Sequence, residues 1–111
     1  MSERIIDPND AVDYILKHGK QFAAAKAQRV YLEEFRKSKK ALLMNLSSET
    51  TVNAREQYAY SHPEYVQVLE GIKEAIEVEE KLRWDLVAAQ ARVEIWRSQE
   101  ATARAEGKAT Q

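Results

Sequence analysis

The chain has 111 residues, with 17 basic and 18 acidic side chains and a formal net charge of −1, and it contains no cysteine, three glycines and two prolines. Its length fits one ordinary domain with one core, and its abundance of Ala, Glu, Lys, Arg and Leu is typical of long helices rather than of a sheet. The lack of cysteine excludes disulfides, thiolate nucleophiles and cysteine-based metal sites, and the balanced charge excludes a global attraction to nucleic acid or to an anionic membrane.

The first predicted helix runs from about residue 9 to about residue 46. It follows the segment DPND at residues 7–10, in which Asn9 or Asp7 can cap the first turn and the acidic groups suit the positive end of the helix. Apolar residues then recur at helical spacing across the whole range. Gly19 interrupts this pattern, and we expect it to mark a bend or a close packing contact.

A polar break, SSETT at residues 47–51, separates this helix from a short second one at about 51–61. Pro63 then sets a boundary, because it lacks an N–H group and disfavours helical geometry at the residue before it. Proline is favourable at the first position of a helix, so we expect the third helix to begin here and His62 to cap or pack at the junction.

The third predicted helix runs from about residue 63 to about residue 105, and the polar tail at 106–111 is expected to fray. Twelve positions spaced alternately by three and four residues form a heptad seam, and ten of them are apolar. These positions are Tyr65, Val68, Ile72, Ala75, Glu79, Leu82, Leu86, Ala89, Val93, Trp96, Glu100 and Ala103.

Together these elements predict an all-α fold, a long antiparallel helical hairpin that resembles a coiled coil, has a short connecting helix and forms a single domain over residues 1–111. Counting away from the turn places Lys37 opposite about Lys73, so the basic run of the first helix faces acidic residues of the third. At the seam positions Glu79 and Glu100, we expect the carboxylates to pair with lysine or arginine across the seam and to fix the register, rather than to act in catalysis.

The segment LRWDLVAAQARVEIWRSQ, at residues 82–99, is apolar on two sides. Beside the seam, it carries a second stripe of five residues, which we call the α-stripe: Trp84, Val87, Ala88, Ala91 and Ile95. A hairpin can bury only one side of this helix, so the α-stripe requires another layer, either the short helix folded back or a second copy of the chain. We therefore predict a protein interface at the α-stripe and assembly into a helical-bundle homodimer or a higher homo-oligomer.

A basic face on the first helix offers an alternative function. It consists of Arg29, Tyr31, Arg36, Lys37, Lys39 and Lys40. Cations beside an aromatic ring can bind single-stranded DNA through its phosphates and bases. Pairing of the same cations with acidic residues of the hairpin, or of a neighbouring subunit, is the interpretation that we favour over nucleic-acid binding.

The sequence predicts no catalytic, cofactor or metal site, and we do not expect an enzyme. His18 and His62 have no His, Asp or Glu three or four residues away, and the chain has no Glu-x-x-His pair of the di-iron type. Glycine-rich phosphate loops are absent, and no serine lies in the context of an activated nucleophile. With no run of ~20 apolar residues and no signal-peptide pattern, we expect a cytoplasmic protein without membrane contact.

Four blocks carry a resemblance to a group of known proteins: YLEEFRK, AYSHPEY, LRW and EIWRSQ. The chain, from about residue 25 to 106, resembles small uncharacterised α-helical proteins of temperate bacteriophages and prophages, often encoded near genes for DNA recombination and replication. The resemblance implies an accessory protein in the cytoplasm of a bacterial host, with a phage or host recombination protein as a partner. It supplies no active site.

Our leading hypothesis is therefore a non-catalytic phage accessory protein in DNA recombination or replication that acts through protein contacts and self-assembly. Two alternatives stay open: single-stranded DNA binding through the basic face, and a structural or assembly component of a phage.

Overall fold

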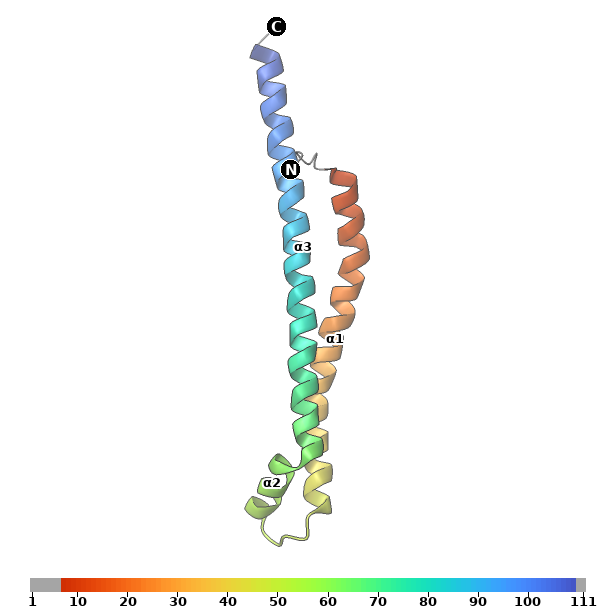
Figure 1. The fold of residues 1–111 in the computed structure, drawn as a ribbon, viewed down its shortest axis with the longest axis vertical. Coiled ribbons are helices and arrows are strands. Elements are labelled where there is room, and N and C mark those ends of the chain that lie inside the picture. The colour runs from red at the N-terminus through yellow and green to blue at the C-terminus, as the bar shows by residue number, and fades with distance from the viewer. Residues whose placement is uncertain (1–6, 110–111) are drawn as a thin grey trace. The chain divides into compact units, whose positions relative to one another are not determined.

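A computed structural model describes residues 7–109, and within that range the chain forms three α-helices and no strand. They are α1 (Pro8–Leu46), α2 (Val52–Ser61) and α3 (Pro63–Ala109), shown in Figure 1. The prediction of an all-α hairpin with a short connecting helix is confirmed.

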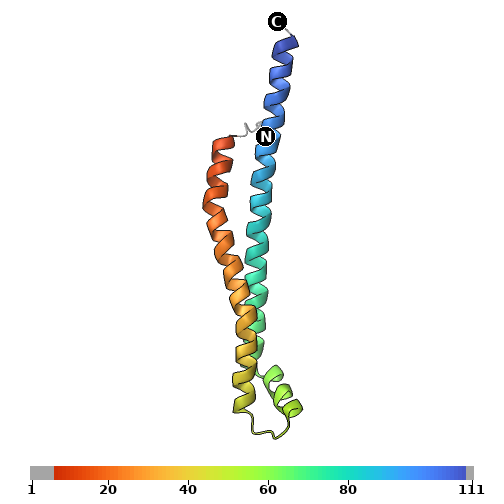
Figure 2. The same ribbon diagram turned by 180° about the vertical axis from the view of Figure 1, so that it is seen from behind.

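The chain divides into two compact units. Unit 2 is Ala23–Glu80 and holds the second part of α1, all of α2 and the first part of α3. Unit 1 holds the described residues up to Phe22 and those from Lys81 onward, so it pairs the start of α1 with the end of α3. Within each unit the α1 and α3 segments run antiparallel and side by side, as Figures 1 and 2 show from opposite directions.

Local capping explains where the helices begin. Helix α1 starts at Pro8, one residue before the predicted start, because Asp7 acts as its cap: the Asp7 carboxylate accepts from the Asn9 N–H at 2.8 Å, and the Asp7 carbonyl accepts from Ala11 at 3.2 Å. Helix α2 starts after Thr51, whose hydroxyl oxygen accepts from the Ala54 N–H at 3.1 Å.

His62 connects α2 to α3, as predicted. Its backbone N–H donates to the Ala59 carbonyl at 3.2 Å and closes α2, while its ring Nδ1 accepts from the Glu64 N–H at 3.1 Å and its carbonyl accepts from Tyr65. One residue thus satisfies backbone groups at the end of one helix and at the start of the next.

The end of α3 differs from the prediction of a frayed tail over 106–111. The helix continues to Ala109, through Gly107, and the last two residues lie outside the described range. No proline or polar cluster interrupts the backbone before Ala109, and a single glycine costs only about 1 kcal/mol relative to alanine.

The core of unit 2 lies where α1, α2 and α3 meet. Leu43, Ala59 and Tyr65 are buried together and Met44 packs against them, while the rings of Tyr60 and Tyr65 contact edge to face at 5.4 Å between centroids. The last turns of α1 therefore pack against α2 as well as against the start of α3.

This packing shifts the register from the one expected. Counting away from the turn would place Lys39 level with Gly71, but the Lys39 ammonium lies 3.5 Å from the Glu64 carboxylate, and Leu32 is the side chain nearest Gly71. The difference is about two helical turns. The expected register assumed that α3 begins level with the end of α1, whereas α2 takes up that space.

The predicted seam of α3 is its buried side through Trp96. Tyr65, Ile72 and Ala75 are buried in unit 2, and Ala89 is buried in unit 1. The other seam residues up to Trp96 are half-buried. The last two predicted positions, Glu100 and Ala103, are exposed. In unit 1 the α1 segment is shorter than the α3 segment, so nothing in the described chain covers these positions.

The buried side of α1 differs from the apolar pattern of its sequence. Val12 and Leu16 in unit 1, and Val30, Leu42 and Leu46 in unit 2, are exposed. The half-buried residues of α1 in unit 2 include four cations of the basic face, Arg29, Arg36, Lys39 and Lys40. Their aliphatic stems can cover apolar surface while their charged groups reach acidic partners.

Gly19 makes no close packing contact of the kind considered above. A Cβ built at Gly19 would meet nothing within 4 Å, so space for another element is not the reason for this glycine.

Candidate protein interface

Helix α3 of unit 1 presents two sides of different exposure. Its seam residue Ala89 retains only 4% of its accessible surface, whereas Trp84, Val87 and Ile95 retain 59%, 40% and 48%. The two small residues of the α-stripe, Ala88 and Ala91, are also exposed. The structure thus brings all five predicted interface residues to one uncovered side of one helix. The sequence allowed two layers over this side, the short helix folded back or a second copy of the chain. The short helix, α2, belongs to unit 2, where it packs on Leu43 and Tyr65.

The environment of Trp84 leaves most of its ring open. The Arg83 guanidinium lies 4.7 Å from the ring centroid, a cation–π contact. Trp84 nevertheless remains more exposed than the other large apolar residues of the α-stripe. Burial of a tryptophan ring stabilises an interface more than burial of most other side chains, so Trp84 is the natural centre of a contact here.

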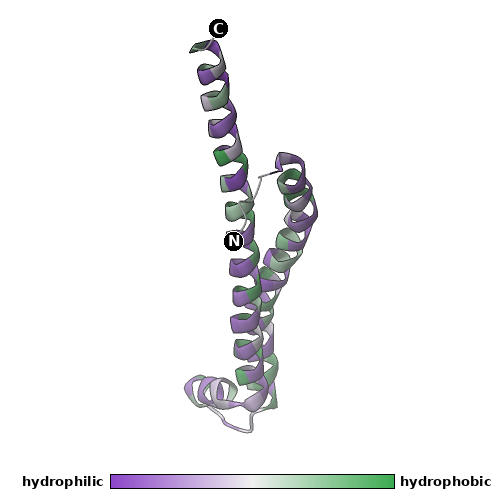
Figure 3. Cartoon of the chain, turned by 45° about the horizontal axis from the view of Figure 1, so that its top comes forward, coloured by the Kyte–Doolittle hydropathy of each residue, from purple (hydrophilic) through white to green (hydrophobic). Residues whose placement is uncertain are grey.

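Charged residues flank the α-stripe and form pairs along the helix. The Lys81 ammonium lies 3.0 Å from the Asp85 carboxylate, and the Arg97 guanidinium lies 3.3 Å from that of Glu94. The neighbouring Asp85 raises the pKa of Lys81. Lys81, Glu94 and Arg97 are exposed and Asp85 is half-buried, so each pair contributes little to stability and exchanges readily with solvent or with another partner. Figure 3 shows hydrophilic and hydrophobic residues interspersed along α3.

The basic face of α1 is largely occupied by ion pairs within unit 2. Arg29 donates to the carboxylates of Glu79 and Glu33, which raises the pKa of its guanidinium. The Arg29–Glu79 pair confirms the seam pairing expected for Glu79. Lys39 pairs with Glu64 at 3.5 Å.

Lys40 and Lys37 complete this set. The Lys40 ammonium lies 3.5 Å from the Glu56 carboxylate and 4.7 Å from the centroid of the Tyr60 ring, and its pKa is raised, chiefly by the Tyr60 side chain. Lys37, whose side chain is 69% exposed, pairs with Glu34 at 3.3 Å within α1. Four of the five cations therefore lie beside acidic groups of the same unit.

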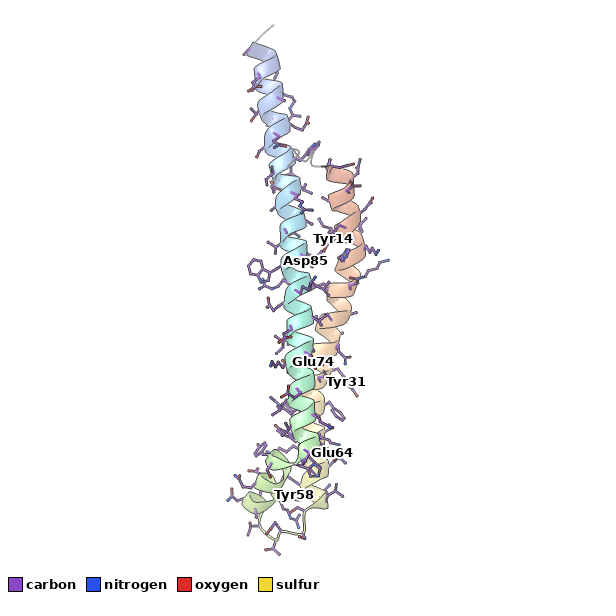
Figure 4. All side chains as sticks on the ribbon, in the orientation of Figure 1. Tyr14, Tyr31, Tyr58, Glu64, Glu74 and Asp85 are labelled. Atoms are coloured by element: carbon purple, nitrogen blue, oxygen red, sulfur yellow. The ribbon has the colours of Figure 1, made fainter. Side chains whose placement is uncertain are left out.

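Tyr31, the aromatic member of the basic face, is exposed and stacks on Phe35 with 6.0 Å between ring centroids. Figure 4 labels Tyr31 on α1 and Glu74 on α3. The face thus combines an open ring with cations whose charge is mostly balanced, which is a weaker arrangement for phosphate binding than a cluster of unpaired cations.

Unit 2 also contains a shallow groove of about 390 Å³ between α1 and α3. It exists because several residues there are small, and its lining consists of Ala25, Gln28, Leu32, Gly71, Glu74, Ala75 and Val78. Only two polar side chains line this groove, so it lacks the convergent polar groups that orient a specific small ligand.

The histidines make local contacts. The His18 Nδ1 lies 3.0 Å from the Tyr14 carbonyl and its ring stacks on Tyr14, with 3.7 Å between centroids. Within residues 7–109, no group of three or more His, Asp or Glu side chains is placed to hold a metal ion. None of the helices in that range combines the length and the apolar character needed to cross a membrane.

The sequence pattern located the α-stripe but not the charges that flank it. Arg83, Asp85, Arg92 and Glu94 lie beside the stripe on α3. Asp85 and Arg92 are seven residues apart, close to two helical turns, and Arg83 and Glu94 are eleven apart, close to three, so each pair of opposite charges follows one edge. The spacing of these charges could have indicated from the sequence that opposite charges line both edges of the α-stripe.

The chain matches no family model, no curated protein and no solved structure.

Proposed function

We propose that this chain is a non-catalytic interaction protein that self-associates through the α-stripe and serves as an accessory factor in phage DNA recombination or replication. One observation carries the self-association: Trp84, Val87 and Ile95 expose their side chains on the same side of α3. An apolar side with this much exposed surface, beside charged residues, is typical of a protein interface.

The phage context comes from the sequence resemblance, and the bacterial cytoplasm is the compartment that this context implies. The exposed apolar side chains of the α-stripe support protein contact as the mode of action. Direct DNA binding has less support, because Arg29, Lys37, Lys39 and Lys40 already pair with glutamates.

Light scattering of the purified chain across micromolar concentrations tests self-association. We expect a dimer or larger species in the natural sequence and a shift to monomer in Trp84→Ser. Leu16→Ser is the matched control, since Leu16 is at least as exposed as Trp84 and belongs to the same unit but lies on α1, and it should leave the mass unchanged. A strict monomer of the natural sequence at these concentrations would overturn the proposal.

Tryptophan fluorescence supplies a second measurement. In Trp96→Phe the emission comes from Trp84 alone, because the chain has two tryptophans. We expect this emission to shift to shorter wavelength as the protein concentration rises, since association removes the ring from water. Emission typical of an exposed ring at every concentration would count against burial of Trp84.

The accessory role requires its own test. We expect the natural chain to change the rate at which a phage single-strand annealing protein pairs complementary oligonucleotides, and we expect Trp84→Ser to lack this effect. An unchanged rate with the natural chain argues against the role in recombination but not against self-association. Binding of the chain alone to a labelled single-stranded oligonucleotide, lost in Lys39→Glu and Lys40→Glu, would favour the DNA-binding alternative instead.

A further inference from the structure

We propose that two copies of the chain pair through their α-stripes in an antiparallel arrangement, with a twofold axis between Ala88 and Ala89. This inference rests on the proposed self-association and specifies its partner, direction and register. All the residues that it uses lie on α3 of unit 1.

The charges beside the α-stripe specify the register of the antiparallel pair. With the axis between residues 88 and 89, Asp85 of one copy lies level with Arg92 of the second copy, on the same edge of the stripe. Arg83 likewise lies level with Glu94 of the second copy on the other edge. Twofold symmetry repeats each contact, so four pairs of opposite charge form around one apolar strip.

These charges are able to change partners. Asp85 now pairs with Lys81 and Glu94 with Arg97 along the helix, and pairs so open to solvent contribute little to stability. Arg92 makes no ion pair with any residue of 7–109. Arg83 can keep its contact with the Trp84 ring, because a guanidinium bonds carboxylates in its own plane while its face stacks on the ring.

The shapes of the apolar residues agree with the same register. Trp84 lies level with the gap between Ala91 and Ile95 of the second copy, so the large ring meets a small residue and a branched one. Near the axis, Ala88 lies beside the same residue of the second copy, and small side chains there allow the two helices to approach closely. The bulky ends and the small centre of the stripe are therefore complementary to themselves when one copy is reversed.

A parallel pair lacks this match. In a parallel arrangement in register, each residue lies level with its own counterpart, and Asp85 is about two turns from Arg92 of the second copy. A parallel pair instead brings opposite edges of the stripe together, so Asp85 lies near Arg83 of the second copy, and the charges alone do not exclude this direction. The shapes favour the antiparallel pair, because in a parallel pair Trp84 meets its own counterpart instead of the gap beside Ala91.

Distances between labels distinguish the two directions. The chain has no cysteine, so Thr102→Cys provides one labelling position per copy. In the antiparallel pair the two Thr102 positions lie about 40 Å apart, at 1.5 Å of rise per residue. In a parallel pair they lie about 10 Å apart, the separation of neighbouring helix axes. Gln90→Cys, near the axis, should give a short distance in either case and shows that the labelled protein is paired.

Charge exchange tests the register. We expect Asp85→Arg or Arg92→Asp alone to weaken dimerisation about tenfold, because each change turns two attractions into repulsions, and we expect the double variant to return to within about threefold of the natural chain. Arg104→Glu is the control, since Arg104 lies on α3 away from the α-stripe, and it should leave the dimerisation constant unchanged.

The outcomes separate the two proposals. A monomeric chain overturns the proposed self-association. A dimer that is lost in Trp84→Ser but has a Thr102 distance near 10 Å, or shows no recovery in the double charge exchange, overturns the antiparallel register alone.

Discussion

The guanidinium of Arg29 donates two hydrogen bonds to the carboxylate of Glu79, fifty residues later in the chain, and joins α1 to α3 inside unit 2. Both side chains are half-buried, and Arg29 also reaches Glu33 on its own helix. A charged pair at a seam position costs desolvation but allows few alternative registers, because any shift of one helix along the other separates the two groups.

Replacement of either member should have unequal effects on stability. Arg29→Met leaves both Glu33 and Glu79 without this cation, whereas Glu79→Leu leaves Arg29 paired with Glu33. We therefore expect Arg29→Met to lower the melting temperature by about 5 °C and Glu79→Leu to lower it less. Thermal unfolding followed by circular dichroism measures both.

The double variant provides the control for this prediction. A methionine opposite a leucine can pack without a charge to desolvate, so Arg29→Met with Glu79→Leu should melt above the Arg29→Met variant. If the two single effects simply add in the double variant, the pair does not interact in the way that its geometry indicates.

The sequence predicted the buried side of α3 but not that of α1, and the composition of the two seams explains the difference. On α3 the seam positions through Trp96 are apolar apart from Glu79, so hydrophobic periodicity identifies them. On α1, Arg29, Arg36 and Lys39 take half-buried positions while Tyr31 and Leu42 are exposed. A pattern based on apolar residues alone cannot assign a side whose burial depends on long charged side chains with partners on another helix.

The register could not be predicted for a related reason. The sequence indicated a short helix between the two long ones, but not that this helix packs beside the last turns of α1, where Leu43 and Ala59 are buried together. The α-stripe was predictable because it depends only on spacing along one continuous helix. The layer that we propose over it is a second copy of the chain, and spacing along one helix does not describe that contact.

The pKa of Lys40 should respond to Tyr60. The Tyr60 side chain is the largest cause of the raised pKa of Lys40, which is ordinarily 10.5, and Glu56 adds to it. We expect Tyr60→Phe to lower this pKa towards 10.5, as measured by NMR titration of the lysine side chain. Tyr58→Phe is the control, since Tyr58 contacts His62 instead, and an equal change in both variants would contradict the assignment.

The same shift has a consequence for stability at alkaline pH. Because the pKa of Lys40 is raised in the folded chain, its contribution is fully present below pH 10.5 and is lost as the pH rises through the raised value. Tyr60→Phe should therefore reduce the loss of stability above pH 10.5, measured by denaturant unfolding at a series of pH values. A loss of the same size in both proteins would assign it to other groups.

Alanine at Gly71 should stabilise the protein. A Cβ there would lie 3.8 Å from Leu32 Cδ1, an ordinary van der Waals contact, and alanine in a helix interior is favoured over glycine by about 0.5–1 kcal/mol. Gly19→Ala tests the backbone effect alone, since its Cβ would meet nothing within 4 Å. Denaturant unfolding should give gains for both, and a loss in Gly71→Ala alone would mean that Leu32 cannot accommodate the methyl group.

His62 should stabilise the start of α3 mainly as a cap rather than through its ring contact. Its Nδ1 accepts from the Glu64 N–H at 3.1 Å, and its ring also contacts Tyr58 edge to face with 5.6 Å between centroids. We expect His62→Ala to lower the free energy of unfolding by about 1 kcal/mol, the usual cost of losing a capping side chain. His62→Asn should recover most of this loss, because asparagine supplies a capping oxygen but no ring. If the asparagine variant is as unstable as the alanine variant, the ring contact with Tyr58, and not the cap, accounts for the stabilisation.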